Sequence, residues 1–452
     1  LNGPQFSWFN PSYVYGIGLH GAGWDVTGNT PFAHPAILFG TNKTISWGST
    51  AGPLDVNDVY QEKLNPDDSH QYWYNGAWRS MDVRTETVRV AGQADVQVPV
   101  YSTVHGFVTS FDPANGVAYS KKRSWTGTEI QSLLAWTKVG KAKDWNGYLE
   151  QAQKVGITIN WYYADKSGNI GYVSPGKLPV RPAGQDPRLP VTGDGSMEWE
   201  GFEPFANNPQ VYNPKQGYIV NWNNQSAAGR NAGSGTWSPV DRVNEIIARL
   251  ESKQKLTKDE VWKINEETSF ADLNVRYLRP FLEHAVQRFP AKSPEAEAAR
   301  LLLDWDGQAR DADRDGHLDG PQPAIMRAWL PIILEDVLKA NLPAPVYANY
   351  TGAYSSVRPA EGLKLVYNAL LGDQSGVPQT EDFLAGRSAD DVVLGTYQRA
   401  LTEVRAANGA DPAGWDTVPT AKHVFSFKNF IGVPQADAAE QLTVLDYMNR
   451  GT

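Results

Sequence analysis

The sequence predicts an α+β protein in which a β-rich body carries a long helical insertion. Short runs of β-branched and aromatic residues, separated by Gly, Asn and Asp turns, dominate the first half of the chain. Apolar residues at helical spacing behind capping signals dominate from Ser238 onward. We therefore divide the 452-residue chain into a β-rich body at 1–235, a mostly helical insertion at 236–412 and a return to the body at 413–452.

Two β-hairpins are predicted in the first half of the chain. One spans 36–47 with a polar turn at 41–43, and the other spans 157–173 with a turn at 165–169. The strands of both are rich in β-branched and aromatic residues, which favour a pleated sheet. A short helix is expected at 128–137.

Helix-start signals mark the second half. Ser238 can cap a helix that has Pro239 at its first position. Thr257 and Glu260 have the spacing of a capping box. Further helices are predicted at 273–289, 293–305, 323–340 and 388–407.

The composition argues against a nucleic-acid partner and a membrane span, and it excludes cysteine chemistry. The net charge of −9 and the lack of a basic tract argue against a nucleic-acid partner. The longest aliphatic stretch, 328–334, is far shorter than the ~20 residues of a membrane helix, so no membrane span is expected. The chain has no cysteine, which excludes a thiol nucleophile, a disulfide framework and a thiolate metal site.

Three catalytic or cofactor motifs are weak or absent. Gly16–Gly21 matches the dinucleotide pattern G-x-G-x-x-G, but 22–31 cannot form the helix that would hold a pyrophosphate. Those glycines fit tight turns and close approach of strands better. The seven histidines lack zinc-ligand helix spacing, and no G-x-S-x-G elbow occurs.

Residues 311–319 form a sharper motif, with the spacing D-x-D-x-D-G-x-L-D. Carboxylates at every second position with Gly at the turn can wrap a calcium ion. Position twelve of such a loop, normally a bidentate acid, is Gln322. Two interpretations stay open, a calcium site and a solvated acidic loop between helices, and the missing acid favours the second.

A family resemblance rests on several segments taken together. They are Asn2-Gly3-Pro4-Gln5-Phe6, Tyr15–Gly23 (YGIGLHGAG), Ser46–Gly52 (SWGSTAG), Ile159–Asp165 (INWYYAD), Asp186–Pro190 (DPRLP), Asn221–Asn224 (NWNN) and Tyr447–Thr452 (YMNRGT). In this order, and over essentially the whole chain, they resemble the catalytic chain of the penicillin G acylases. The fit is better than to the cephalosporin or acyl-homoserine-lactone acylases.

The resemblance implies an N-terminal-nucleophile hydrolase, an αββα sandwich with a helical insertion. In that family an exported precursor cleaves itself into two chains, and the N-terminal Ser of the larger chain attacks an amide carbonyl. The α-amine of that Ser is the base, since α-amines titrate at a pKa of ~7.7–8.0. The resemblance implies a smaller α chain as partner, a periplasmic or secreted location, and an N-acyl amide substrate such as penicillin G. No residue from Leu1 onward matches the Ser, so the polypeptide alone is expected to be inactive.

The same resemblance assigns site residues one by one. The side-chain amide of Asn223 and the backbone N–H of Ala51 match the two oxyanion donors. Gln5 matches a residue near the nucleophile, and Arg242 matches the residue that orients the catalytic Asn. The acyl pocket maps onto Pro4, Phe6, Leu38, Phe39, Ser49, Trp136 and Ile159. Without the resemblance, Phe6, Trp136 and Ile159 fit plain core packing equally well.

The family also holds a structural Ca²⁺, and no organic cofactor is implied. Its ligands match Asp55, Asn57 (backbone carbonyl), Asp58 and Pro187 (backbone carbonyl). A further family ligand falls in 226–237, where no residue can be assigned, and another comes from the smaller chain.

Two rival functions stay open. One is an acylase of the same fold for another acyl class, of the acyl-homoserine-lactone or cephalosporin type. The other is a non-catalytic binding protein that keeps the aromatic pocket and the calcium loop.

Overall fold

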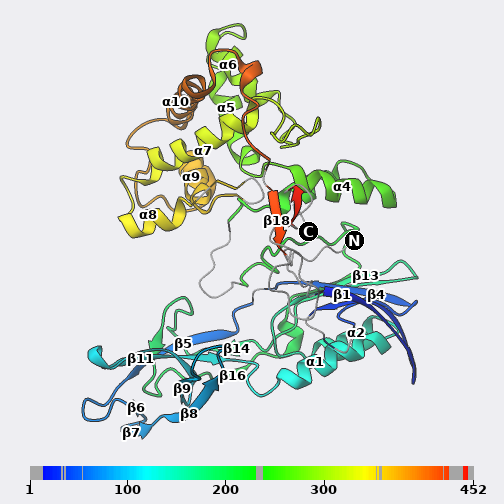
Figure 1. Cartoon of the computed structure of the whole chain (residues 1–452), viewed down its shortest axis with the longest axis vertical. Coiled ribbons are helices and arrows are strands. Elements are labelled where there is room, and N and C mark those ends of the chain that lie inside the picture. The colour runs from blue at the N-terminus through cyan, green and yellow to red at the C-terminus, as the bar shows by residue number, and fades with distance from the viewer. Residues whose placement is uncertain are drawn as a thin grey trace. The chain divides into compact units, whose positions relative to one another are not determined.

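The computed structural model describes residues 14–31, 34, 37–52, 54–230, 238–352, 354–355, 359–420, 422–426 and 441–445. The chain forms two compact units, one from residues 13–237 and one that contains 238–452. Strands prevail in the first unit and helices in the second (Figure 1). The three-part division predicted from the sequence stays a prediction.

The first unit contains an antiparallel seven-stranded sheet in its described part, with the order β1-β2-β3-β4-β12-β13-β17. Its strands are β1 Val14–Gly21, β2 Trp24–Pro31, β3 Phe39–Thr41, β4 Ile45–Thr50, β12 Asn160–Asp165, β13 Ile170–Val173 and β17 Gln210–Tyr212. Both predicted hairpins are confirmed, as β3–β4 and β12–β13. The pairing of β4 with β12 sets Ser49 opposite Trp161 and Thr50 opposite Asn160.

The glycine-rich motif lies in the β1–β2 hairpin. Gly21 pairs with Trp24 across the turn, so no helix follows the glycines. Gly28 on β2 meets β3 so closely that a Cβ there would lie 2.0 Å from the carbonyl oxygen of Phe39. The expected tight turn is confirmed, because Gly21 has φ +127°, whereas the close approach of strands is seen at Gly28, outside the motif.

Two helices pack against this sheet, α1 Glu129–Lys138 and α2 Trp145–Ala152 (Figure 1). Trp136 of α1 and Tyr148 of α2 each place their ring centroid 5.5 Å from that of Trp161 on β12. The helix predicted at 128–137 is thereby confirmed, and its buried face is aromatic.

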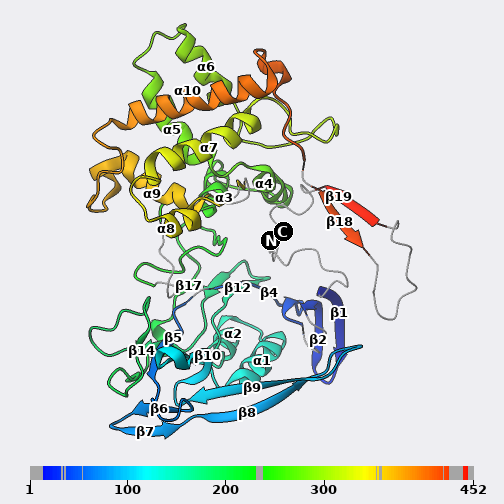
Figure 2. The same cartoon turned by 60° about the vertical axis from the view of Figure 1, so that its left-hand side comes forward.

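A second sheet of the same unit has the order β15-β5-β11-β10-β9-β8. Its strands are β5 Asn57–Lys63, β8 Asp82–Val88, β9 Val96–Thr103, β10 Gly106–Asp112, β11 Val117–Arg123 and β15 Val191–Thr192. β15 runs parallel to β5, whereas the other pairs are antiparallel. β8 and β9 form a long hairpin (Figure 2). Short pairs complete the unit: β6 Gln71–Tyr74 with β7 Ala77–Ser80, and β14 Pro179–Val180 with β16 Gly201–Phe202.

The second unit is built on helices around one apolar core. They are α3 Val243–Glu251, α4 Lys258–Phe270, α5 Val275–Val286, α6 Pro294–Leu303, α7 Gln322–Leu338, α8 Ala344–Tyr350, α9 Glu361–Leu371 and α10 Ala389–Asn408. The core joins side chains of α5, α6, α7, α9 and α10, and α7 and α10 lie side by side (Figure 2). Strands β18 Lys422–Ser426 and β19 Gln441–Leu445 pair as a hairpin.

Most predicted helices of this unit are confirmed, and one start is wrong. The capping box of Thr257 and Glu260 opens α4 with both hydrogen bonds in place. The helix expected at Ser238 begins instead at Val243, because the Ser238 hydroxyl accepts a hydrogen bond from the Val240 N–H and forms a local turn. Helices α8 and α9 were not predicted.

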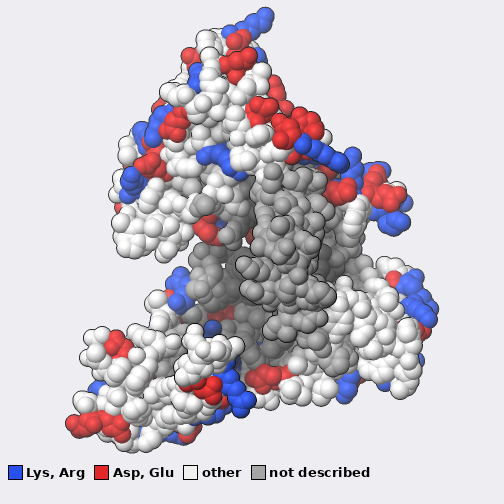
Figure 3. All heavy atoms as spheres, in the orientation of Figure 1, with Lys and Arg blue, Asp and Glu red and all other residues white. Residues whose placement is uncertain are grey.

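No helix in the described part of the chain is long and apolar enough to cross a membrane. On the face shown in Figure 3, acidic and basic side chains are interspersed within each unit. The described residues on that face form no broad basic patch.

Candidate active site

Ala51 and Asn223, far apart in the sequence, meet in the first unit. Ala51 directly follows β4 and is exposed, and Asn223 lies in the loop after β17. The side-chain Nδ2 of Asn223 donates to the Ala51 carbonyl oxygen at 2.9 Å. Asn223 has φ +63°, a left-handed conformation that Asn tolerates better than most residues. The predicted pair of oxyanion donors is thus brought together.

A network of amide side chains supports this pair, and the sequence analysis assigned it no role. The side-chain oxygen of Asn221 accepts from the backbone N–H of Asn223 at 2.7 Å and from the Thr50 hydroxyl at 3.1 Å. Fully buried Asn160 donates to the Ala51 carbonyl at 2.8 Å. An asparagine inside a β-rich run, as Asn160 is, was the signal that could have revealed it, since buried amides must be hydrogen-bonded.

This arrangement can stabilise an oxyanion. An Asn Nδ2 carries two protons, so it can donate to Ala51 and to one further acceptor. The hydrogen bonds of Asn221 and Asn160 hold the Ala51 and Asn223 backbone before any substrate arrives. Preorganised donors of this kind stabilise a tetrahedral intermediate without reorganisation during the reaction.

Several residues predicted to line the acyl pocket lie close together in the same unit. Trp136 donates its indole N–H to the Leu38 carbonyl at 3.0 Å, and its ring lies edge-on to Phe39 with centroids 6.3 Å apart. Ser49 shares a sheet face with Trp161, which Trp136 contacts. Half-buried Ile159 precedes that strand by one residue. A pocket wall and a core both have this lining, so the pocket role stays a prediction.

The remaining predicted residues are placed elsewhere or lie outside the described residues. Pro4, Gln5 and Phe6 lie outside them. Arg242 belongs to the helical unit, where its carbonyl accepts from the Glu245 N–H at the start of α3. Its role in orienting Asn223 stays a prediction.

Three of the predicted calcium residues, Asp55, Asn57 and Asp58, lie at the start of β5, where an arginine compensates part of the carboxylate charge. Arg181 contacts Asp55 Oδ1 through Nη2 at 3.0 Å and Asp58 Oδ2 through Nε at 2.8 Å. The indole N–H of Trp199 also donates to Asp58 Oδ2, at 2.6 Å. Arg181 and Trp199 were both missed by the sequence analysis, because nothing in their local sequence points to β5.

Unpartnered acceptors at this loop fit a cation. Asp58 Oδ1 and Asn57 Oδ1 are buried and have no hydrogen-bond partner among the described residues. Burial raises the pKa of Asp55 to about 6, although Arg181 opposes that shift. Pro187 precedes β15, which pairs in parallel with β5 through Val191 and Thr192. The loop where Ca²⁺ is expected therefore offers both free oxygen acceptors and negative charge that Arg181 only partly compensates.

Comparison with known proteins identifies the family. The penicillin amidase family profile matches residues 1–451. The chain belongs to the penicillin amidase family. Penicillin G acylase of Escherichia coli is 43% identical over 465 aligned residues, which cover 100% of this chain and 55% of that protein. An acyl-homoserine lactone acylase, QuiP of Pseudomonas syringae pv. syringae, is 26% identical over 87% of this chain and 48% of its own length.

A solved penicillin amidase structure confirms the fold class. A thermostable penicillin G acylase from Alcaligenes faecalis superposes with a TM-score of 0.90 and 46% identity, covering 98% of this chain and 82% of that one. The α+β N-terminal-nucleophile-hydrolase fold expected from the resemblance is therefore correct. The chain spans about half the length of the curated relatives it matches.

Proposed function

We propose that this chain is the greater part of the catalytic chain of an amidohydrolase that cleaves N-acyl amides such as penicillin G. The contact between Asn223 Nδ2 and the Ala51 carbonyl oxygen supports the proposal, because it brings together the two residues that we propose as oxyanion donors. The higher identity to penicillin G acylase than to the acyl-homoserine-lactone acylase favours an arylacetyl group over a fatty acyl group.

The proposed reaction is acyl transfer to a serine that comes from outside this sequence. The serine hydroxyl attacks the amide carbonyl, and the serine α-amine takes its proton. The resulting oxyanion is held by Asn223 Nδ2 and the Ala51 N–H. The intermediate collapses with protonation and departure of the amine, and water then releases the acid through a second oxyanion at the same donors.

Further features follow from this proposal. The proposal includes a serine from outside this sequence and a smaller chain from the same precursor as partner. The proposal also includes export of the precursor to the periplasm. Asp55, Asn57, Asp58 and Pro187 would hold a structural Ca²⁺ at the start of β5, beside Arg181.

The function is tested by measuring amide hydrolysis by the processed full-length protein, both as wild type and as the Asn223→Gly variant. Glycine removes the amide but accepts φ +63° without strain. We expect release of phenylacetate from a phenylacetyl amide, and a fall in kcat of about 10²–10³-fold in the variant. Asn213→Gly is the matched control, because Asn213 is an exposed asparagine with φ +48° in the same unit.

The outcomes separate the rival functions. Wild-type activity in Asn223→Gly would remove the oxyanion role. Faster cleavage of fatty-acyl homoserine lactones than of phenylacetyl amides would favour the other acyl class. Binding of phenylacetyl amides without turnover by the processed wild type would favour a binding protein.

A further inference from the structure

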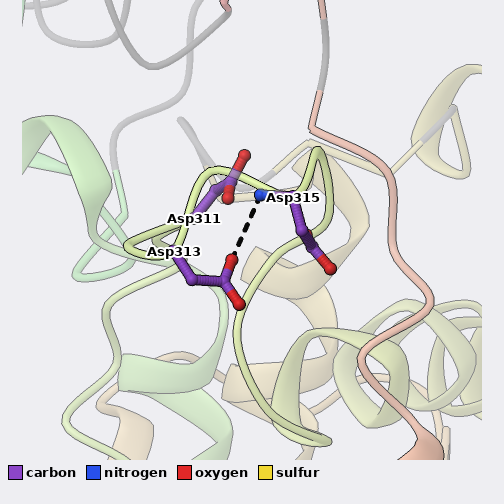
Figure 4. A group of neighbouring side chains, drawn as sticks. All are labelled: Asp311, Asp313 and Asp315. Atoms are coloured by element: carbon purple, nitrogen blue, oxygen red, sulfur yellow. Dashed lines mark hydrogen bonds between the residues drawn. The ribbon is translucent and has the colours of Figure 1, made fainter.

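The loop between α6 and α7 contains three clustered carboxylates that the proposed catalytic role does not use. Asp311, Asp313 and Asp315 each offer one oxygen, and these oxygens all lie within 4.8 Å of one another (Figure 4). Exposed acidic clusters are common, so the cluster alone is no evidence for a metal site. The burial and hydrogen bonding of Asp311 distinguish this cluster from an ordinary acidic loop.

Asp311 is buried and only partly satisfied. The residue is 8% exposed, and its Oδ2 accepts from the Thr420 hydroxyl at 3.0 Å. Its Oδ1 is buried without a hydrogen-bond partner among the described residues. None of the described Lys, Arg or His side chains forms a salt bridge with it. A buried carboxylate oxygen without a donor is costly unless a cation neutralises it.

The neighbouring groups occupy the sequence positions that calcium ligands take in such a loop. Asp313 and Asp315 are exposed, and Asp313 accepts only from the Asp315 backbone N–H among the described contacts, at 3.2 Å. Two backbone hydrogen bonds join this loop to residues 418–420, and they involve the Gly316 carbonyl and the Leu318 N–H. The His317 carbonyl takes part in neither of them. Positions one, three, five and seven of a calcium loop are these three carboxylates and that carbonyl.

We propose that Asp311, Asp313 and Asp315 bind Ca²⁺, with the His317 carbonyl as a further ligand. Hard oxygen donors in an irregular loop suit Ca²⁺, which accepts variable coordination geometry, better than Mg²⁺, which demands near-ideal octahedral geometry. Asp319 fastens the loop by accepting from the Ala312 N–H at 3.0 Å. Gln322 at position twelve cannot supply a bidentate carboxylate, so the site is weaker than a sensor-type calcium loop.

The ion would join two segments of the helical unit. Asp311 contacts Thr420, and Thr420 donates its backbone N–H to the Gly316 carbonyl at 2.8 Å. Neutralising Asp311 therefore stabilises both the α6–α7 loop and the 418–420 segment that follows α10. This proposal does not depend on the proposed hydrolase activity or on the site at Asp58.

The test uses the full-length processed protein, stripped of metal and titrated with CaCl₂ or MgCl₂. Calcium content, calorimetric affinity and the Ca²⁺-dependent rise in Tm are measured for wild type, Asp311→Asn and Asp313→Asn. Asp306→Asn in the same loop is the matched control, and Asp58→Asn reports the separate site at β5. We expect both cluster variants to bind one Ca²⁺ fewer, or to bind it at least about tenfold more weakly, because they lose a charged ligand.

Each outcome decides the proposal. Loss of one Ca²⁺ in Asp313→Asn, with the content of Asp306→Asn unchanged, supports it. If Asp311→Asn fails to fold, the exposed Asp313 variant still gives the answer. Equal calcium content and affinity in wild type and Asp313→Asn, or a loss confined to Asp58→Asn, would overturn it.

Discussion

The two units bury different kinds of side chain. In the strand-rich unit, Glu62 and His105 have fully buried side chains joined at 2.8 Å, and His105 reaches Glu198 at 2.6 Å on its other nitrogen. In the helical unit, the core is a continuous set of Leu, Ile, Val and Trp side chains around α7. Buried polar groups of this unit such as Asn274 and Asp311 lie at helix ends and in loops, and Thr396 is a buried polar residue within α10.

This difference suits the strand-rich unit to holding polar atoms in place for chemistry and the helical unit to providing stability. The hydrogen bonds of a buried polar network can fix particular backbone atoms in place. Asn160 and Asn221 do this for Ala51 and Asn223. An apolar core contributes stability without fixing any single polar atom, and the helical unit is built on one.

The largest expected effect tests the apolar core. Trp329 on α7 is fully buried, and its indole N–H donates to the Thr396 hydroxyl at 3.0 Å. We expect Trp329→Ala to lower the free energy of unfolding by about 3–5 kcal/mol, measured by denaturant titration. Trp262→Ala is the matched control, because Trp262 on α4 is 54% exposed, and we expect a change within about 0.5 kcal/mol. Equal losses in both variants would break the comparison.

A smaller effect tests the polar network. Asn160 and Asn208 are both buried asparagines of the strand-rich unit, but only Asn160 contacts Ala51. We expect Asn160→Ala and Asn208→Ala each to cost about 1–3 kcal/mol of stability. Only Asn160→Ala should also lower kcat, by up to about 10²-fold, because the Ala51 carbonyl loses its support. Similar kcat values for the two variants would mean that the network is structural only.

The smallest effect tests an exposed helix cap. Thr257→Ala removes one half of the α4 capping box and should cost about 1 kcal/mol. Contacts with Lys253 and Thr257 lower the pKa of Glu260 to about 2, from an ordinary value near 4.5. The contribution of Glu260 is therefore fully present above about pH 4.5 and is lost as the pH falls towards 2. Unfolding curves at about pH 6 and about pH 3 should show a smaller difference between wild type and Thr257→Ala at the lower pH.

The sequence predicted local structure where the signal was local. The capping box at Thr257 and the hairpin at 157–173 follow from short-range patterns, and both are confirmed. The start of α3 was misplaced because Ser238 satisfies a backbone N–H in a turn as readily as at a helix end. The meeting of Ala51 with Asn223 was expected from resemblance, since no local rule joins residues so far apart.

By itself, the sequence determined the α+β class, the helix caps and hairpins, and through its ordered motifs the penicillin amidase family. Only the tertiary structure decided which polar groups are buried and what they contact. The contact of Arg181 with Asp55 and that of Asn160 with Ala51 join segments that are distant in sequence, and so does the burial of Asp311 against Thr420. The reason is physical: hydrogen bonds and charge compensation are set by distances in space, and a linear pattern encodes only neighbours along the chain.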